Sequence, residues 1–323
     1  MSRTGSSEIA LRVVQSPSSR KSTTLRAISS EHADDDYGEA VARVCVVGSV
    51  NMDLVFAVDA LPNPGATVLA SSMTQSPGGK GGNQAIAAAR AGAEVSVVAA
   101  VGDDAAGEAL KTHLSDNGVD VAGITTLPVP SGTASIVVDA HAENVIVVAP
   151  GANGHLSLTS AALRDVVAGC EVLLMQLEIP LDTATTAARI ARAAGATVML
   201  NASPAGADPS ALAQLAEVTD VVIVNESEAA LWNWPVPHLV TTLGARGASH
   251  RTAGGQTRVP AYPVEALDTT GAGDVFAGVL AAGWAHDPAH ALRRACAAGA
   301  LATLVPGAGD CAPYDEAIED ALN

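Results

Sequence analysis

Aromatic and charged side chains are scarce in this chain. Only 2% of its 323 residues are aromatic and 16% are charged, whereas 48% are hydrophobic. A buried core must therefore be built from Ala, Val, Leu and Ile. The chain has no unbroken run of roughly 18 apolar residues, which argues against a membrane-spanning helix. Its first residues lack the charged-then-apolar layout of a secretory signal, so we expect a cytoplasmic protein.

The chain also has no closely spaced pair of cysteines and few lysines. The four cysteines show neither a CxxC pair nor the spacing of metal ligands, and we interpret them as small buried hydrophobic residues in a reducing compartment. They are Cys45, Cys170, Cys296 and Cys311. The formal net charge of −17 disfavours binding to a polyanion such as DNA or RNA. Beyond residue 30 the lysines are Lys80 and Lys111, and Lys80 lies within a glycine cluster.

Residues 1 to about 42 differ in composition from the rest of the chain. They are rich in Ser, Thr and Arg, and they turn acidic at Asp34–Asp36. In the first 30 residues, Glu8 is the single acid among five Arg and Lys residues. This composition, with little sustained periodicity, predicts a disordered extension. An organelle-targeting peptide, which is also basic, hydroxyl-rich and poor in acids, is the alternative.

From Val44 onward, short β-branched runs alternate with Ala-rich helical stretches. The predicted strands are Val44–Val47, Val95–Ala99, Val172–Met175, Thr197–Leu200, Val221–Val224 and Leu239–Thr242. The predicted helices are Gly82–Ala91, Gly107–Asn117, Leu181–Ala194 and Pro209–Ala216. Buried strands separated by helices are typical of a parallel sheet covered on both faces. We therefore predict an α/β fold over residues 43–323, with a doubly wound, mainly parallel sheet.

Two segments interrupt this alternation. Leu54–Thr74 and Thr133–Val148 are predicted to form hairpin strands, with a turn at Ala140–Asn144 in the second. Such strands cannot lie within the parallel sheet, because parallel neighbours need long crossovers. We expect them to form a small β-sheet lid over one edge of the body.

Polar residues follow the first predicted strand. Asn51 and Asp53 alternate just after Val47, so both side chains can point to the side where ligands lie in open α/β sheets. An Asn/Asp pair suits a polyol, because each hydroxyl needs a donor and an acceptor. An ordinary turn closed by Asx hydrogen bonds is the alternative.

Four glycines surround Lys80 between Pro77 and Gln84, directly before a predicted helix. Such a cluster allows the backbone to approach a ligand closely, with amide groups directed at it. It is not a P-loop, because GxxxxGK[ST] is absent. A flexible linker is the alternative, but a linker rarely carries Lys and Asn at its centre and opens directly into a helix. The cluster therefore predicts a binding site.

The segment Asp268–Asp274 is the strongest local signal. Gly271, Ala272 and Gly273 directly precede a helix of small apolar residues, whose free amides and dipole form an anion site. We predict that Asp274, at the lip of this helix, takes a proton from a hydroxyl while the amides stabilise phosphate charge. A helix cap or a first-turn acid is the alternative interpretation of Asp274.

Together these motifs resemble the ribokinase family of carbohydrate kinases over about residues 43–320. The family's sugar-binding turn is similar to Gly48–Asp53, its glycine signature to Gly78–Gln84, and its C-terminal signature to Asp268–Asp274. Four further family markers occur in the expected order. They are Gly151–Asn153, Met175–Glu178, Asn225–Glu228 and Thr242–Gly247.

The resemblance implies ATP-dependent phosphorylation of D-ribose at its 5-hydroxyl, with Asp274 as the catalytic base. It assigns the sugar to Asn51, Asp53, Gly79, Lys80, Asn83, Glu178 and Asp274. It assigns ATP to Asn225, Glu228, Thr242, Gly244, Gly247, Gly271, Ala272 and Gly273, with Asn225 and Glu228 facing Mg²⁺. It assigns an activating K⁺ to Asp268, Thr270, Ala302, Val305, Gly307 and Cys311.

The expected partners are a small-molecule sugar and ATP, without nucleic acid or membrane, and a second copy bound through the lid. A kinase for deoxyribose, a ketose or a nucleoside is an alternative, as is a non-catalytic sugar or nucleotide sensor. The chain departs from the family in one place. Only Ala229–His238, which includes Trp232 and Trp234, replaces a helix that the family usually carries there, and this connection is near the minimum for a parallel crossover.

Overall fold

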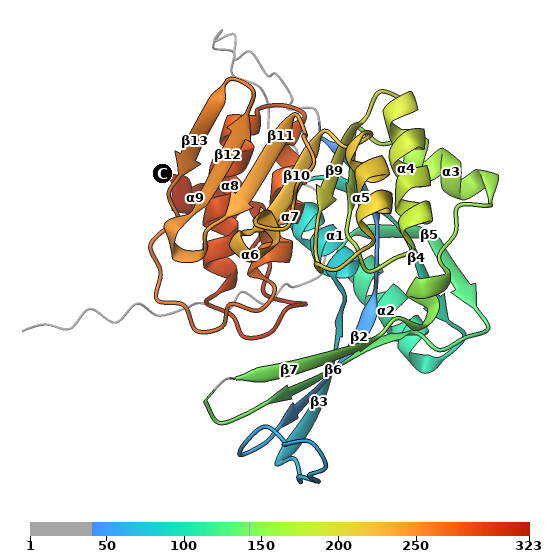
Figure 1. The fold of residues 1–323 in the computed structure, drawn as a ribbon, viewed down its shortest axis with the longest axis vertical. Coiled ribbons are helices and arrows are strands. Elements are labelled where there is room, and N and C mark those ends of the chain that lie inside the picture. The colour runs from blue at the N-terminus through green and yellow to red at the C-terminus, as the bar shows by residue number, and fades with distance from the viewer. Residues whose placement is uncertain (1–40, 142) are drawn as a thin grey trace, which may run out of the picture. The chain divides into compact units, whose positions relative to one another are not determined.

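The computed structural model describes residues 41–141 and 143–323, and its body is built on a nine-stranded sheet (Figure 1). The strand order is β13-β12-β11-β10-β9-β8-β1-β4-β5. Neighbours from β11 to β5 are parallel, and β12 and β13 add an antiparallel edge. The strands are β1 (Arg43–Val47), β4 (Glu94–Gly102), β5 (Val119–Leu127), β8 (Val172–Met175), β9 (Thr197–Asn201), β10 (Val221–Asn225), β11 (His238–Thr242), β12 (Ala248–Thr252) and β13 (Gly255–Val259).

Helices cover both faces of this sheet. One face packs against α1 (Lys80–Arg90), α2 (Ala105–Asp116), α7 (Ala272–Trp284), α8 (Pro288–Ala302) and α9 (Asp315–Leu322). The other face packs against α3 (Ala161–Ala168), α4 (Leu181–Ala193) and α5 (Pro209–Ala216). Val44 and Val46 of β1 enter the first core, whereas Cys45 and Val47 enter the second, as strand alternation requires. Both cores consist mainly of Ala, Val, Leu and Ile, as the composition predicts.

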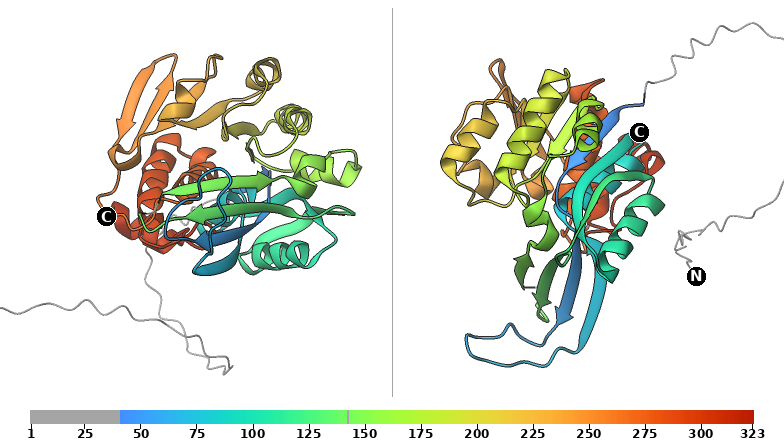
Figure 2. Two further views of the ribbon diagram at one scale, coloured as in Figure 1. Left: turned by 60° about the horizontal axis from the view of Figure 1, so that its bottom comes forward. Right: turned by 90° about the vertical axis from the view of Figure 1, so that its right-hand side faces the viewer.

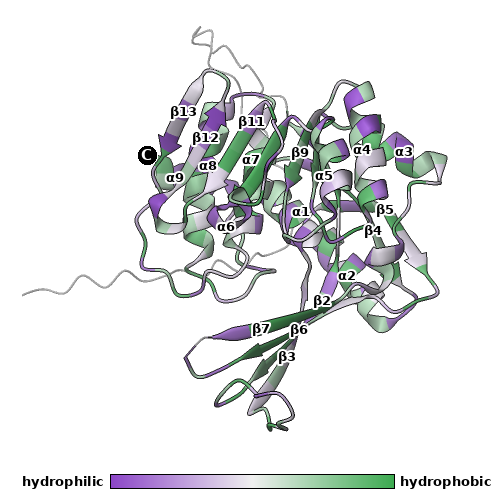
Figure 3. Cartoon of the chain, in the orientation of Figure 1, coloured by the Kyte–Doolittle hydropathy of each residue, from purple (hydrophilic) through white to green (hydrophobic). Residues whose placement is uncertain are grey.

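A separate four-stranded sheet projects from the body (Figure 2). Its order is β3-β2-β6-β7, and its members are β2 (Asn51–Ala57), β3 (Ser72–Gly78), β6 (Gly132–Val138) and β7 (Asn144–Ala149). β2–β3 and β6–β7 are antiparallel hairpins, and β2 lies parallel to β6. Hydrophobic residues lie along β2, β6 and β7 of this sheet as well as along the central strands of the body (Figure 3). The predicted fold class, a doubly wound sheet with a small β lid, is confirmed.

The predicted boundaries need correction at the lid. β2 begins at Asn51 and β3 ends at Gly78, so Asn51 and Asp53 belong to a lid strand rather than to a turn. Helix α1 begins at Lys80, two residues earlier than predicted. The predicted strands do not include β5, β12 or β13. β12 and β13 are largely polar or exposed, and in β5 apolar residues are interrupted by Asp120 and by Thr125 and Thr126. The Gly254-Gly255 pair, a common hairpin turn, could have revealed β12 and β13.

β10 and β11 are parallel neighbours, and the short crossover noted in the sequence connects them. It contains only the one-turn helix α6 (Glu226–Ala229). Trp232 is buried against the second core, and its ring meets Trp234 edge to face at 5.1 Å. The tryptophan pair thus supplies the apolar cover that a longer helix would provide.

The predicted disordered extension falls on residues 1–40, apart from its last two positions, and so lies outside the described residues. Within the part of the chain that the structure describes, no helix has the length and apolarity needed to cross a membrane.

Candidate active site

Asp274 lies at the centre of the predicted site, in the first turn of α7, and only 8% of it is exposed. Its Oδ2 accepts a hydrogen bond from Asn83 Nδ2 at 3.1 Å, and its Oδ1 accepts one from Gln84 Nε2 at 2.9 Å. Both donors lie on α1, which packs against α7. Two helices distant in the sequence therefore fix the orientation of this carboxylate.

Behind Asp274 lies a chain of buried amides that the sequence analysis did not assign. Gln84 Nε2 also donates to Asn201 Oδ1 at 3.0 Å, and Gln84 Oε1 accepts from Gln176 Nε2 at 2.6 Å. Both protons of the Gln84 amide are thus used. Gln84 and Gln176 stand inside two quoted motifs and Asn201 ends a predicted strand, so their positions carried a signal.

On the lid side, Asn153 holds the first sugar candidate. Its Nδ2 donates to Asn51 Oδ1 at 2.8 Å and to the Val50 carbonyl at 3.0 Å, while its Oδ1 accepts from the Val50 amide at 3.0 Å. Because the oxygen of Asn51 is occupied, its NH₂ group is the part available to a ligand. Glu178 is fixed in a similar way, because its Oε2 accepts from Ser49 Oγ at 2.6 Å.

Four carboxylates and one ammonium set the charge of the site. Burial, together with the nearby charges of Glu178 and Asp274, raises the pKa of Asp53 to about 7. Asp274 raises the pKa of Lys80, an effect that burial opposes and that Glu178 and Glu228 reinforce. Lys80 is therefore held in its charged form between the carboxylates.

Two cavities flank these residues. One, of about 540 Å³, is lined by Asn51, Asn153, Glu178 and apolar residues that include Val148 of the lid. The other, of about 150 Å³, is lined by Lys80, Asn201, Ser203, Ile223, Val224, Asn225, Glu228, Thr242, Gly271, Gly273 and Asp274. A larger cavity of about 750 Å³, between β12–β13 and α8, contains none of the predicted residues. The lining residues of the two smaller cavities, and not cavity volume, therefore identify the candidate site.

The nucleotide candidates are arranged more locally. Asn225 caps α6 by accepting from the Glu228 amide at 2.8 Å, and Glu228 Oε2 accepts in return from the Asn225 amide at 2.9 Å. Thr242 lines the smaller cavity with them. Gly244 and Gly247, in and after the 3₁₀ turn Gly244–Arg246, do not line it.

The glycine cluster also has a packing role within the protein. Gly79 adopts a φ of +87°, and a Cβ at this position would lie 2.7 Å from the Asn51 amide nitrogen. The lack of a side chain lets the start of α1 pack directly on β2. The cluster therefore brings Lys80 and Asn83 toward the lid strand, and binding of a ligand by its amides stays a prediction.

The predicted cation-binding segments lie side by side. Asp268 Oδ1 accepts from the Thr270 amide at 2.9 Å and Oδ2 accepts from the Gly307 amide at 2.8 Å. Burial raises the pKa of Asp268, but these hydrogen bonds outweigh it and hold the pKa below its usual value. Cys311 Sγ lies 3.9 Å from the Thr270 carbonyl, while Ala302 is buried at the end of α8.

Comparison with known proteins agrees with this geometry. Residues 41–315 match the pfkB family carbohydrate kinases. The ribokinase of Bacillus subtilis is 36% identical over 87% of this chain and 99% of its own. A bifunctional ribokinase/ribose-5-phosphate isomerase A of Fructilactobacillus sanfranciscensis is 33% identical over 87% of this chain, which spans 56% of that protein.

Among solved structures, an Arabidopsis thaliana ribokinase in complex with ribose and ATP superposes with a TM-score of 0.80 at 26% identity. The match covers 88% of this chain and 99% of that one. The sequence match, the fold and the carboxylate at a helix start lead to the same assignment: the chain is a kinase that belongs to the pfkB family of carbohydrate kinases.

Proposed function

We propose that this kinase transfers the γ-phosphate of ATP to the 5-hydroxyl of D-ribose, giving ribose 5-phosphate and ADP. The observation that carries the proposal is the placement of Asp274. This carboxylate lies in the first turn of α7, beside Gly271 and Gly273, and is oriented by two amide donors from α1. A base held next to the free amides of a helix start can accept the hydroxyl proton while the amides stabilise the transferred group.

In this proposal the cavity of about 540 Å³ holds the sugar. Asn51 donates from its free NH₂ group, and Asp53 and Glu178 accept from sugar hydroxyls. Lys80, Asn83 and the backbone at Gly79 complete the set, and Asp274 faces the reacting hydroxyl. An anionic acceptor is disfavoured, because Asp53, Glu178 and Asp274 lie on this side.

The smaller cavity holds the phosphate end of ATP, next to Asn225, Glu228, Thr242 and the amides of Gly271–Gly273. Gly244 and Gly247 contact the nucleotide further out. Lys80 is the one cation among the described residues that line the two cavities, so the chain itself cannot neutralise a triphosphate. Mg²⁺ supplies that charge when bound with ATP, and Asn225 and Glu228 would hold it through water.

The predicted ligands in the 268–270 and 302–311 segments suit a weakly hydrated cation, because most of them would offer backbone carbonyls and Asp268 is the one carboxylate among them. K⁺ would be held by Asp268 with Thr270, Ala302, Val305, Gly307 and Cys311. Its chemistry is to stabilise the loop geometry. The hydrogen bonds from Thr270 and Gly307 to Asp268 support the proximity of these segments.

We also propose a homodimer formed through the lid, in the cytoplasm. β7 is an end strand of the lid sheet, and its residues Val145–Val148 are between 41% and 64% exposed. An exposed apolar edge strand favours pairing with a second copy. Sedimentation of the Val147→Lys variant against the wild type tests this contact, and an unchanged dimer would contradict it.

A coupled assay of ADP formation tests the reaction with ribose, deoxyribose, fructose and adenosine. We expect the highest kcat/KM with ribose. We expect little ATP hydrolysis without sugar, because the site becomes competent for transfer only when the lid closes over the sugar and excludes water. A higher kcat/KM with deoxyribose or fructose would replace ribose within the same family. Sugar binding without turnover in any reaction would favour a sensor instead.

A further inference from the structure

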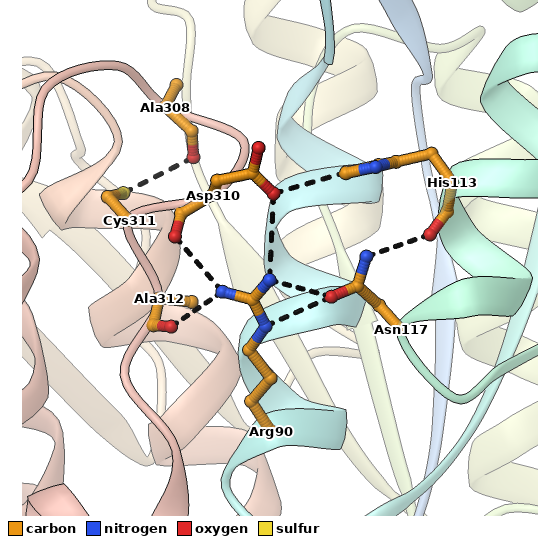
Figure 4. A network of polar contacts seen from close by, with 7 residues as sticks. All are labelled: Arg90, His113, Asn117, Ala308, Asp310, Cys311 and Ala312. Carbon is orange, nitrogen blue, oxygen red and sulfur yellow. Dashed lines mark hydrogen bonds and ion pairs between the residues drawn. The ribbon is translucent and has the colours of Figure 1, made fainter. Parts of the chain in front are cut away.

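The strongest polar network outside the site surrounds Arg90, the last residue of α1 (Figure 4). Its Nη1 donates to the carbonyls of Asp310 at 3.1 Å and Ala312 at 2.8 Å. Its Nη2 and Nε both donate to Asn117 Oδ1, at 2.7 and 3.0 Å. Nη2 also lies 3.6 Å from the Asp310 carboxylate. The guanidinium thus makes four hydrogen bonds and one ion pair, and 10% of the side chain is exposed.

This network joins three parts of the fold. Asn117 caps α2, where its Nδ2 donates to the His113 carbonyl at 2.9 Å, and His113 Nε2 lies 4.0 Å from the Asp310 carboxylate. The ring of Tyr314 lies over the guanidinium, with 5.0 Å from Arg90 Cζ to its centroid. Arg90 therefore anchors the segment 310–314 to both α1 and α2.

Residues 308–312, which overlap this anchored segment, pack on the Gly271–Gly273 turn that is predicted to bind phosphate. Cys311 lies between the two carbonyls that Arg90 binds, and its Sγ contacts the Ala308 carbonyl at 3.3 Å. Gly271 has a φ of +77°, and a Cβ there would lie 2.8 Å from Ala308 Cα and 3.1 Å from Cys311 Sγ. The backbone of Gly271 thus rests on this segment with no room between them. A shift of the segment must move the turn that opens α7.

We infer that Arg90 is a positioning residue for phosphoryl transfer, which sets the amides of Gly271–Gly273 through the 308–312 segment. The inference rests on the proposed function. Lys80, Asn83 and Gln84 lie on the same helix, so α1 aligns both the sugar-facing residues and the phosphate-binding turn. Removing the guanidinium leaves two carbonyls and Asn117 without a donor, and the segment relaxes away from Gly271.

Arg294 supplies a matched control. Its side chain is 12% exposed, donates to the Ala91 carbonyl at 3.2 Å and forms ion pairs with Asp315 and Glu319. It anchors α9 and makes no hydrogen bond or ion pair with the 308–312 segment. Arg90→Gln and Arg294→Gln remove the same group from equally buried sites, so both are expected to lower Tm by several degrees.

Only the Arg90 change is expected to affect the phosphate side. In Arg90→Gln, kcat falls roughly 10–100-fold, because a small misplacement of positioning groups has that effect on rate. The Kd for ribose, measured calorimetrically without nucleotide, stays within about twofold, since the sugar contacts are not altered. Arg90→Lys keeps the charge but not the fork of donors, and its kcat is intermediate. In Arg294→Gln, kcat is unchanged.

A measurement independent of activity uses the thiol of Cys311, which is 2% exposed. Its alkylation by iodoacetamide, followed by peptide mass spectrometry, becomes several-fold faster in Arg90→Gln and Arg90→Lys but not in Arg294→Gln. Equal Cys311 alkylation in all variants would overturn the inference, as would a parallel loss of kcat in both glutamine variants. If the wild type does not phosphorylate ribose, the proposed function fails, whereas the thiol result still tests the loop contact.

Discussion

The sugar side and the nucleotide side of this site are built in different ways. On the sugar side, Asn51, Asn83 and Asn153 are at most 5% exposed, and their side-chain hydrogen bonds join segments more than 100 residues apart. On the nucleotide side, Asn225 is exposed, and its side chain accepts hydrogen bonds only within its own helix turn, from residues at most three positions away. The sugar side is a product of the whole fold. On the nucleotide side, Asn225 and Glu228 form a local cap, whereas the Gly271–Gly273 turn rests on the distant 308–312 segment.

This difference teaches where rigidity lies before any ligand arrives. The buried chain Gln176–Gln84–Asp274 is joined by hydrogen bonds within the protein, although Gln176 Oε1 accepts none, so its geometry is prepared in advance. Exposed caps leave the triphosphate side open to solvent. Substitutions on the sugar side should therefore have large effects, and those on the nucleotide side smaller ones.

The largest effect on kcat is expected at Asp274, where the sugar side and the nucleotide side meet. Asp274→Asn removes the proton acceptor but keeps the shape of the side chain, so kcat should fall about 10²–10⁴-fold. Ribose affinity should be nearly unchanged, because the remaining sugar contacts persist. Steady-state kinetics and calorimetry measure the two quantities. A variant with more than half of the wild-type kcat would show that Asp274 is not the base.

A second change tests the sugar side alone. Asp53→Asn should weaken ribose binding by ~10-fold or more, since a hydrogen bond to a charged group is lost. The pKa of Asp53 is raised from 3.8 to about 7, so the stability this carboxyl contributes is present below about pH 4 and lost as pH rises through 7. The variant should therefore have a higher Tm than the wild type at pH 8 but not at pH 4. A lower Tm at pH 8 would contradict the buried-charge interpretation.

A third change acts on the nucleotide side. Replacing K⁺ with a bulky organic cation at fixed ionic strength should lower the initial rate a few-fold, because the cation stabilises a loop and does not react. Asp268→Ala should resemble the K⁺-free wild type and lose the response to K⁺. Identical rates in the two buffers for the wild type would eliminate the cation site.

The smallest effect on kcat and Tm is expected for residues 1–40, which belong to neither the sugar side nor the nucleotide side. Deleting residues 1–40 should leave kcat and Tm nearly unchanged, because that segment contains too little apolar sequence to pack firmly. Thermal melts and steady-state rates of the truncated chain provide the test. A large drop in Tm would show that the segment packs on the kinase body.

The features that the sequence predicts are local ones, and those that it misses depend on contacts between distant residues. The central body strands are short, continuous apolar runs, so the parallel sheet was predictable at positions such as Val172–Met175. The lid strands were also found, because Thr133–Val148 breaks the helical alternation. Asp274 was singled out from its glycines. Gln84 and Asn201 were not, because an amide shows its role only when folding brings its partner from more than 100 residues away.

Helix α1 also limits how this kinase can change in evolution. It begins with Lys80 among the carboxylates and ends with Arg90 under the 308–312 segment, and Asn83 and Gln84 lie between them. Inserting or deleting one residue would rotate everything beyond that point by about 100° and separate these two ends from their targets. Length variation should therefore occur in surface loops, and new sugar specificities should arise in β2, β7 and the wall at Leu177–Pro180 rather than in α1.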